Sequence, residues 1–151
     1  MVPNTIFADS TMQNDLFDHA KFHFLNKFPE SLPIENAYLH IGMFMGWIID
    51  QELYSEYFEE EAETEIFRFK LRELSPMLLS EIWGGALSHD LLNEKGKSFA
   101  DYYYASGEFL KDYESVLANG LPSIYHVQDN WRNYKKISDL MDHKFQMWSK
   151  G

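Results

Sequence analysis

The stretch from Asn36 to Asp50 carries apolar residues on nearly every side. A surface helix would place polar residues along one face, whereas this stretch has only His40 between its polar ends. Glu35 lies at its start, where a carboxylate suits the positive end of a helix dipole. The pattern therefore predicts a buried central helix over about residues 35–50, around which the rest of the chain packs.

Two stripes on this helix follow from a turn of about 100° per residue. Gly42 and Gly46 lie together on one stripe, where the lack of side chains lets another backbone approach closely. The other stripe combines polar groups with large side chains and indicates a candidate pocket. With a histidine from later in the chain, its members are Asn36, His40, Trp47, Asp50 and His126. The alternative is that His40 is a core histidine whose ring is satisfied by the backbone or by a buried acid.

Apolar residues at three- and four-residue steps predict further helices, over about residues 15–27, 56–74, 76–82, 88–103, 108–118 and 129–148. The expected N-caps are Asn14, Ser55, Ser75, Ser88 and Asp129. Residues 67–72 alternate like a strand but have no convincing pairing partner, so they are kept in a helix. We expect an all-α fold: one compact domain over residues 1–151 with about six or seven helices, in which residues 1–14 form an irregular N-terminal arm.

The composition narrows the functional classes. The 151 residues include no Cys, which excludes disulfides and thiolate chemistry, and 17% of them are aromatic, which predicts a ring-rich core. The N-terminus lacks a signal peptide and no stretch is long enough to span a membrane, so a cytoplasmic location is expected. A formal net charge of −11 disfavours nucleic acid and favours basic partners. No phosphate-binding loop or nucleophile elbow is present, so an enzyme is the less favoured class.

The strongest charge feature is the run from Glu52 to Glu65, which holds seven glutamates and no base. One interpretation is a solvated helix face, which is the usual fate of such runs. The other is a recognition surface for a basic protein, since complementary charge steers association. The candidate partner-binding residues are Glu56, Glu59, Glu60, Glu61, Glu63 and Glu65.

A metal site was also considered in the first predicted helix. His19 and His23 lie four residues apart, and Asp15 or Asp18 would supply a third ligand. This spacing is common, and the flanking residues lack the glutamate of a typical zinc motif. We therefore expect surface or packing histidines here, with no metal and no other cofactor.

Several segments, among them Phe28–Pro33, His40-Ile-Gly-Met-Phe44 and Leu121–Val127, together resemble a family of small uncharacterised bacterial helical proteins whose members are encoded near polymorphic-toxin and secretion loci. The similarity extends over roughly residues 18–148, and its most distinctive part is His40-Ile-Gly-Met-Phe44. The other matching segments are Phe28–Pro33, Asn36, Trp47, Leu91–Gly96, Phe99, Tyr102–Tyr103, Leu121–Val127, Trp131 and Tyr134. By its context, the resemblance implies an immunity or toxin-neutralising role, and it implies no catalytic residues.

Three functional hypotheses follow. The first is a protein-binding module: a bacterial immunity-type protein that neutralises a toxin or effector domain, its basic partner, through the acidic surface. The second is a small-ligand-binding protein or enzyme with a pocket around His40, Trp47 and Asp50. The third is a structural adaptor subunit that buries the acidic helix in a larger assembly.

Overall fold

The structure is a computed structural model and describes residues 15–151. The predicted irregular arm and the predicted Asn14 cap lie outside these residues. Eight α-helices and two short strands follow along the described chain: β1 (Leu16–His19), α2 (Lys21–Phe24), α3 (Leu39–Asp50), α4 (Glu56–Glu61), α5 (Glu63–Lys70), α6 (Pro76–Ile82), β2 (Ala86–Ser88), α7 (Glu94–Tyr103), α8 (Glu108–Leu117) and α9 (Trp131–Lys150). Three 3-10 helices complete the list: η1 (Ile34–Tyr38), η2 (His89–Leu91) and η3 (Ile124–His126).

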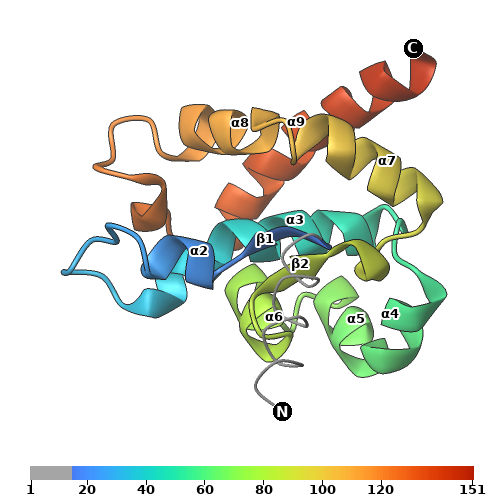
Figure 1. Cartoon of the computed structure of the whole chain (residues 1–151), viewed down its shortest axis with the longest axis horizontal. Helices are drawn as coiled ribbons and strands as arrows, with labels where there is room; N and C mark the ends of the chain where they lie inside the picture. The colour runs from blue at the N-terminus through green and yellow to red at the C-terminus, as the bar shows by residue number, and fades with distance from the viewer. Residues whose placement is uncertain (1–14) are drawn as a thin grey trace, which may run out of the picture.

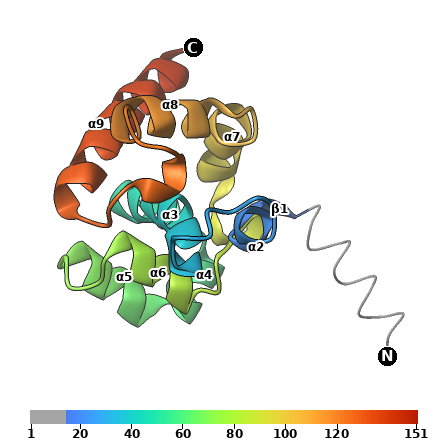
Figure 2. The ribbon, with the colours of Figure 1, turned by 90° about the vertical axis from the view of Figure 1, so that its left-hand side faces the viewer.

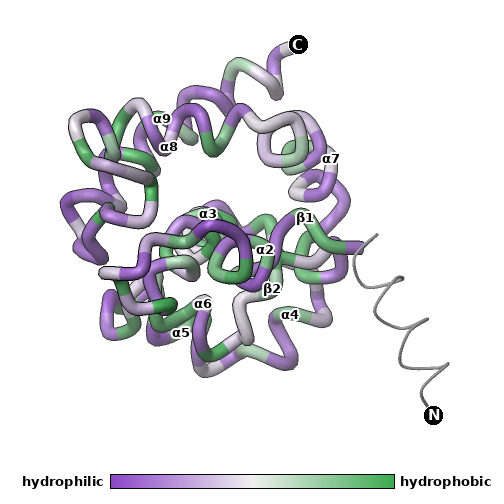
Figure 3. Tube along the Cα trace, turned by 60° about the vertical axis from the view of Figure 1, so that its left-hand side comes forward, coloured by the Kyte–Doolittle hydropathy of each residue, from purple (hydrophilic) through white to green (hydrophobic). Residues whose placement is uncertain are grey.

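Helix α3 lies between two groups of helices. Helices α4, α5 and α6 pack on one side of it, and α7, α8 and α9 lie on the other (Figures 1 and 2). The strands β1 and β2 and the short helix α2 lie beside α3, between these groups. Hydrophobic residues gather around α3, whereas much of α8 and α9 is hydrophilic (Figure 3). The predicted all-α fold is confirmed, because the small sheet contributes only seven residues, four in β1 and three in β2.

The predicted central helix is also confirmed. Every residue of α3 from Leu39 to Ile49 is buried, and only Asp50 is partly exposed. Burial of each large apolar side chain stabilises the fold by roughly 1.5–3 kcal/mol, so α3 is the largest single contribution to the core. The chain enters it through the 3-10 helix η1 after Pro33, whose extended backbone ends the preceding loop.

The predicted close approach to the two glycines of α3 is present. A Cβ atom on Gly42 would lie 1.9 Å from the carbonyl oxygen of Pro76, the first residue of α6. A Cβ atom on Gly46 would lie 2.3 Å from the ring of Phe69 in α5. Ser75 is the N-cap of α6, as predicted. Its Oγ accepts a hydrogen bond from the Leu78 amide, which holds the first turn of α6 in place.

The helix predicted over residues 56–74 is in fact two helices. Ser55 caps α4 as expected, with its Oγ accepting from the Phe58 amide. Ala62 then leaves helical geometry, with φ of −121°, and α5 starts one residue later. After the break, Phe58 of α4 lies beside Met45 and Ile48 of α3, and Phe69 of α5 lies beside Gly46. Because Ala62 itself is fully buried, tertiary packing overrides its high helix propensity.

The prediction of a helix over residues 15–27 was wrong. Residues 16–19 form β1, which pairs antiparallel with β2, and only Lys21–Phe24 make a short helical turn. The predicted helix from Ser88 to Tyr103 was wrong in its first part for the same reason, since Ser88 ends β2. Asn93 caps α7 instead, through its side-chain oxygen and the Gly96 amide.

The C-terminal helices follow the prediction closely. Gly107, at φ of +92°, separates α7 from α8, and α8 runs over nearly the expected residues. Asn130 rather than the predicted Asp129 caps α9, accepting from the Asn133 amide at 2.8 Å. No helix within residues 15–151 combines the length and the apolar character that a membrane crossing requires.

Candidate functional site

A buried carboxylate, Asp18, lies at the centre of a polar cluster inside this apolar fold. Its Oδ1 is 2.8 Å from Nε2 of His23, and its Oδ2 is 3.1 Å from Nε2 of His40. Tyr104 donates its hydroxyl hydrogen to Oδ2, and the backbone amide of His19 donates to Oδ1 at 2.8 Å. The side chains of Asp18, His23 and His40 are 7%, 13% and 1% exposed, so water contributes little to satisfying them.

The local backbone explains why Asp18 points inward. In the sheet, Leu16 pairs with Ser88 but Asp18 pairs with Leu87, so β1 carries one extra residue between these two pairs. Such a bulge re-aims side chains and bends the strand. Ala20 then donates its amide to the Gly85 carbonyl, which starts the turn of α2 that places His23 over the carboxylate.

Two further contacts orient the histidine side of the cluster. The hydroxyl of Tyr125 lies 2.7 Å from Nδ1 of His23, on the opposite side of the ring from Asp18. The backbone carbonyl of Tyr125 accepts a hydrogen bond from the Asn36 side chain at 2.8 Å, which links η3 to η1. The cluster therefore joins β1, α2, α3, the end of α7 and η3, five segments that are far apart in the sequence.

The ionisation states follow from burial and from these contacts. Burial alone would raise the pKa of Asp18, but hydrogen bonds from His23 and His40, with their electrostatic attraction, hold this pKa well below its ordinary value. Burial lowers the pKa of His40 despite the opposing effect of Asp18, so the ring is neutral at pH 7 and still donates an N–H. Burial and the charge of Asp18 raise the pKa of Tyr104 well above its ordinary value, so its hydroxyl remains a donor.

The neutral His40 makes stability depend on pH. We expect the free energy of unfolding to fall as the pH drops below about 6.5, because the unfolded ring takes up a proton that the folded ring refuses. One such proton corresponds to about 1.4 kcal/mol per pH unit. Urea unfolding in EDTA at about pH 7.5 and about pH 5 measures the effect.

The matched control for this prediction is His40→Gln. Glutamine keeps a side-chain N–H for Asp18 but does not titrate, so the pH dependence of the variant should be weaker than that of the wild type. Equal pH dependence in the two proteins would show that His40 does not take part. Other histidines are present in both proteins and cancel in this comparison.

The same cluster has the composition of a metal site. One ligand atom each from Asp18, His23 and His40 lies within 4.8 Å of the others. The two histidine Nε2 atoms are 3.1 Å apart. Two imidazole nitrogens and a carboxylate oxygen suit zinc and similar transition metals.

A second feature is the acidic face of α4 and α5, which we define by its six glutamates. Five of them are exposed and one is partly exposed: Glu56, Glu59, Glu60, Glu61, Glu63 and Glu65. None of the six takes part in an ion pair with another residue in the described range 15–151. Two large apolar side chains are exposed on the same helices, Tyr57 (49%) and Phe67 (63%).

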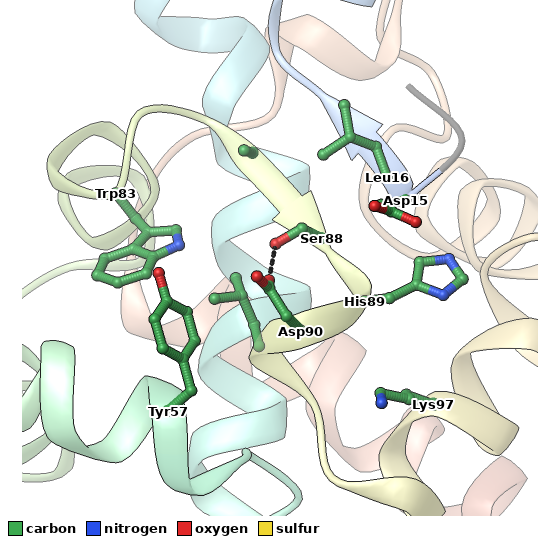
Figure 4. A pocket seen from close by; sticks show the side chains of 10 residues that line it. Asp15, Leu16, Tyr57, Trp83, Ser88, His89, Asp90 and Lys97 are labelled. Atoms are coloured by element: carbon green, nitrogen blue, oxygen red, sulfur yellow. Dashed lines mark hydrogen bonds between the residues drawn. The ribbon is translucent and has the colours of Figure 1, made fainter. Parts of the chain in front are cut away.

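A cavity of about 430 Å³ opens next to this face, where α4 meets β2 and η2. The rings of Tyr57 and Trp83 form one side of it, and Asp15 and His89 lie on the other, with Asp90 between (Figure 4). Ser88 donates its hydroxyl hydrogen to Asp90, which fixes that carboxylate at the cavity wall. Aromatic faces beside carboxylates favour a cationic group.

The structure separates the residues of the candidate pocket predicted from the sequence. Asn36 and His40 both lie beside Tyr125, at the Asp18 cluster. The other three have different partners. Trp47 donates to Asp142, and Asp50 accepts from Arg72 and Tyr134. His126 lies 2.9 Å from the Ser123 hydroxyl. Because His40 is 1% exposed, a substrate reaches it only if the surrounding segments move.

The metal ligands considered from the sequence are likewise divided. Asp18 and His23 face each other, but Nδ1 of His19 accepts the Lys21 amide instead, and Asp15 is exposed. The third ligand of the site is His40, which the four-residue spacing of His19 and His23 does not indicate. The sequence marks the segments that contain Tyr104 and Tyr125 as candidate groove walls, but it does not link these two hydroxyls to Asp18 and His23, because nothing near them distinguishes one tyrosine among nine.

Comparison with known proteins supplies a family but no function. No curated protein and no solved structure matches the chain. A family model described as a domain of unknown function, DUF7832, matches residues 16–127, about three-quarters of the chain. The matched range includes the central helix, the acidic face and the whole Asp18 cluster. The chain belongs to the DUF7832 family.

Proposed function

We propose that this protein is a binding module of the immunity type, which acts in the cytoplasm and neutralises a basic toxin or effector domain by covering it. The observation that carries the proposal is the acidic face of α4 and α5. Five of its six glutamates are exposed and Glu65 is partly exposed, and none of the six forms an ion pair within residues 15–151. The same two helices expose the rings of Tyr57 and Phe67.

The charge of this face is suited to a basic partner. Exposed like charges on two short helices repel one another and lower the stability of the fold. A contribution to folding stability therefore does not explain why six glutamates gather on this face. A partner rich in Lys and Arg relieves that repulsion and is steered toward the face, which raises association rates by about 10- to 1000-fold. The net charge of −11 adds to the same attraction at longer range.

The exposed rings and the neighbouring cavity provide the apolar part of an interface. Binding energy at interfaces is concentrated in a few buried aromatic and Arg contacts, with charges around them. Tyr57 and Trp83 line a cavity together with Asp15, Asp90 and Lys97. The ammonium of Lys97 is paired with Glu94, so the two rings and the two aspartates remain for a Lys or Arg side chain of the partner. Tyr57, which follows Glu56 in α4, lines this cavity, so the cavity adjoins the acidic face.

The test is a charge reversal on the acidic face. We expect Glu59→Lys, Glu60→Lys and Glu61→Lys together to slow association with the partner by about 10-fold or more, because the steering field changes sign locally. The partner is first isolated from the native host at low salt and purified, and association rates are then measured by stopped flow. The wild-type rate should also fall as salt is raised.

A matched control separates the effect of the acidic face on association from the effect of net charge. Asp101→Lys, Glu114→Lys and Asp139→Lys make the same change in net charge at exposed positions of α7, α8 and α9, helices that lie on the other side of α3 from α4 and α5 (Figure 1). This second triple variant should retain most of the wild-type rate. If both triple variants lose association equally, or if neither does, the acidic face is not the binding surface.

A further inference from the structure

We propose that Asp18, His23 and His40 bind one divalent transition-metal ion of the zinc class, and that this ion ties β1 and α2 to the central helix. The inference goes beyond the proposed function and does not depend on it. The three ligands come from β1, α2 and α3, whereas the acidic face lies on α4 and α5 (Figure 1).

The spacing of the three ligand atoms is close to that of a coordination sphere. With Oδ2 as the carboxylate ligand, their separations are 3.0 Å from His23 Nε2 to Asp18 Oδ2, 3.1 Å from His40 Nε2 to Asp18 Oδ2, and 3.1 Å between the two Nε2 atoms. Bonds of about 2.0–2.1 Å in tetrahedral zinc place neighbouring ligand atoms roughly 3.3 Å apart. The ligands therefore need to separate by only a few tenths of an ångström to accept the ion.

The contact between the two imidazoles points to a shared cation. Each Nε2 atom faces the same carboxylate, and the two nitrogens lie 3.1 Å from each other with edge-on rings. If both nitrogens carry hydrogens, the hydrogens crowd one another as both aim at Asp18. With a cation between them, both Nε2 atoms present lone pairs instead, and the hydrogens move to Nδ1.

The outer contacts match those of metal-bound histidine. A histidine that binds a metal through Nε2 carries its hydrogen on Nδ1 and usually donates it to an oxygen. Nδ1 of His23 lies 2.7 Å from the Tyr125 hydroxyl, which is such an oxygen. Tyr104 donates a hydrogen bond to Oδ2 of Asp18, which orients the carboxylate toward the two histidines.

The type of ion and its role follow from the donors and from burial. Two nitrogens and one oxygen favour zinc-class metals over Mg²⁺ and Ca²⁺, which prefer oxygen ligands. The ligands come from β1, α2 and α3, so one ion bridges three segments of the chain. Because their side chains are at most 13% exposed, the ion is structural and has little access to a substrate.

The experiment uses the full chain after EDTA treatment and dialysis. Titration with ZnCl₂ in a calorimeter should give one ion per chain with a dissociation constant below about 1 μM, whereas MgCl₂ and CaCl₂ should give no binding heat. Zinc should also raise the thermal midpoint, since a ligand that binds only the folded state stabilises it. Absence of zinc binding tighter than about 100 μM would overturn the proposal.

Three variants test the assignment of the ligands. His23→Gln removes one ligand at a partly exposed position and should weaken zinc binding by about 100-fold or more. Tyr125→Phe removes only the oxygen partner of Nδ1 and should weaken binding by about 10- to 100-fold. His143→Gln, on the exposed part of α9, should bind as the wild type does.

The controls make each result decisive. Far-UV circular dichroism and urea unfolding in EDTA show whether each variant is folded before zinc is added. Co²⁺ in place of zinc reports the site directly, because its visible absorption bands change with the ligands that surround it. If His23→Gln is folded and gives the same zinc affinity and the same Co²⁺ spectrum as the wild type, the ion binds elsewhere and the proposal is wrong.

Discussion

Gly42→Ala is expected to lower the free energy of unfolding by about 3 kcal/mol or more, although the same change in an exposed helix would stabilise it by about 1 kcal/mol. The added Cβ would lie 1.9 Å from the carbonyl oxygen of Pro76 and 2.6 Å from its carbonyl carbon. Both atoms are backbone, held by the Ser75 cap at the start of α6. Relief of the overlap therefore requires α3 and α6 to move apart along their main contact.

Gly46→Ala is the matched comparison four residues later. Its Cβ would meet the far end of the Phe69 ring at 2.3 Å, and a side chain can rotate where a backbone cannot. We expect a smaller loss, about 1–3 kcal/mol, because the ring is fully buried and has limited room. Urea unfolding of the two variants shows which of them loses more free energy of unfolding. If Gly42→Ala is as stable as the wild type, the close backbone contact does not exist in solution.

This pair of glycines illustrates what the sequence shows well. A run that is apolar on all sides has only one place in a small domain, its centre, so residues 35–50 could be assigned without any structure. The spacing of Gly42 and Gly46 also predicted close approach. The sequence did not identify the neighbours, because Pro76 and Phe69 reach the glycines only through the tertiary fold.

The errors have a common physical origin. Residues 15–27 present apolar positions that fit a helix, but β1 obtains a partner from β2, about 70 residues later, and pairing overrides local preference. The two strands have only four and three residues, too short to leave a recognisable alternation. In the 56–74 segment, burial of Ala62 breaks a helix that propensity alone would continue.

The Asp18 cluster could be predicted only in part. Two of its members, Asp18 and His23, lie only five residues apart in one predicted helix, so the sequence offers them as a pair. His40 was singled out on different grounds, as a polar ring in an apolar stretch, and nothing linked it to Asp18. A separation of 22 residues carries no periodic signal, so the meeting of these groups depends on the strand that replaced the predicted helix.

Asp18→Asn is expected to lower the free energy of unfolding by about 3 kcal/mol or more at pH 7, measured by urea unfolding in EDTA. The carboxylate accepts hydrogen bonds from the side chains of His23, His40 and Tyr104 and from the backbone amide of His19. Asparagine has the same shape but only one oxygen, and its NH₂ group would face donors in a site with little water. Unpaired buried donors then cost the fold their full desolvation energy.

The direction of the Asp18 pKa shift explains why the stability of this variant is measured at pH 7. A folded-state pKa for Asp18 far below its unfolded value of 3.8 stabilises the protein above that value, so the whole contribution is present at pH 7. Asp139→Asn is the control, because it removes a carboxylate of the exposed Lys135 pair and should change stability by less than about 0.5 kcal/mol. If both variants lose equally little free energy of unfolding, the buried carboxylate does not hold the five segments together. A large loss in Asp18→Asn alone, with zinc absent, shows that the hydrogen bonds organise this site before any ion binds.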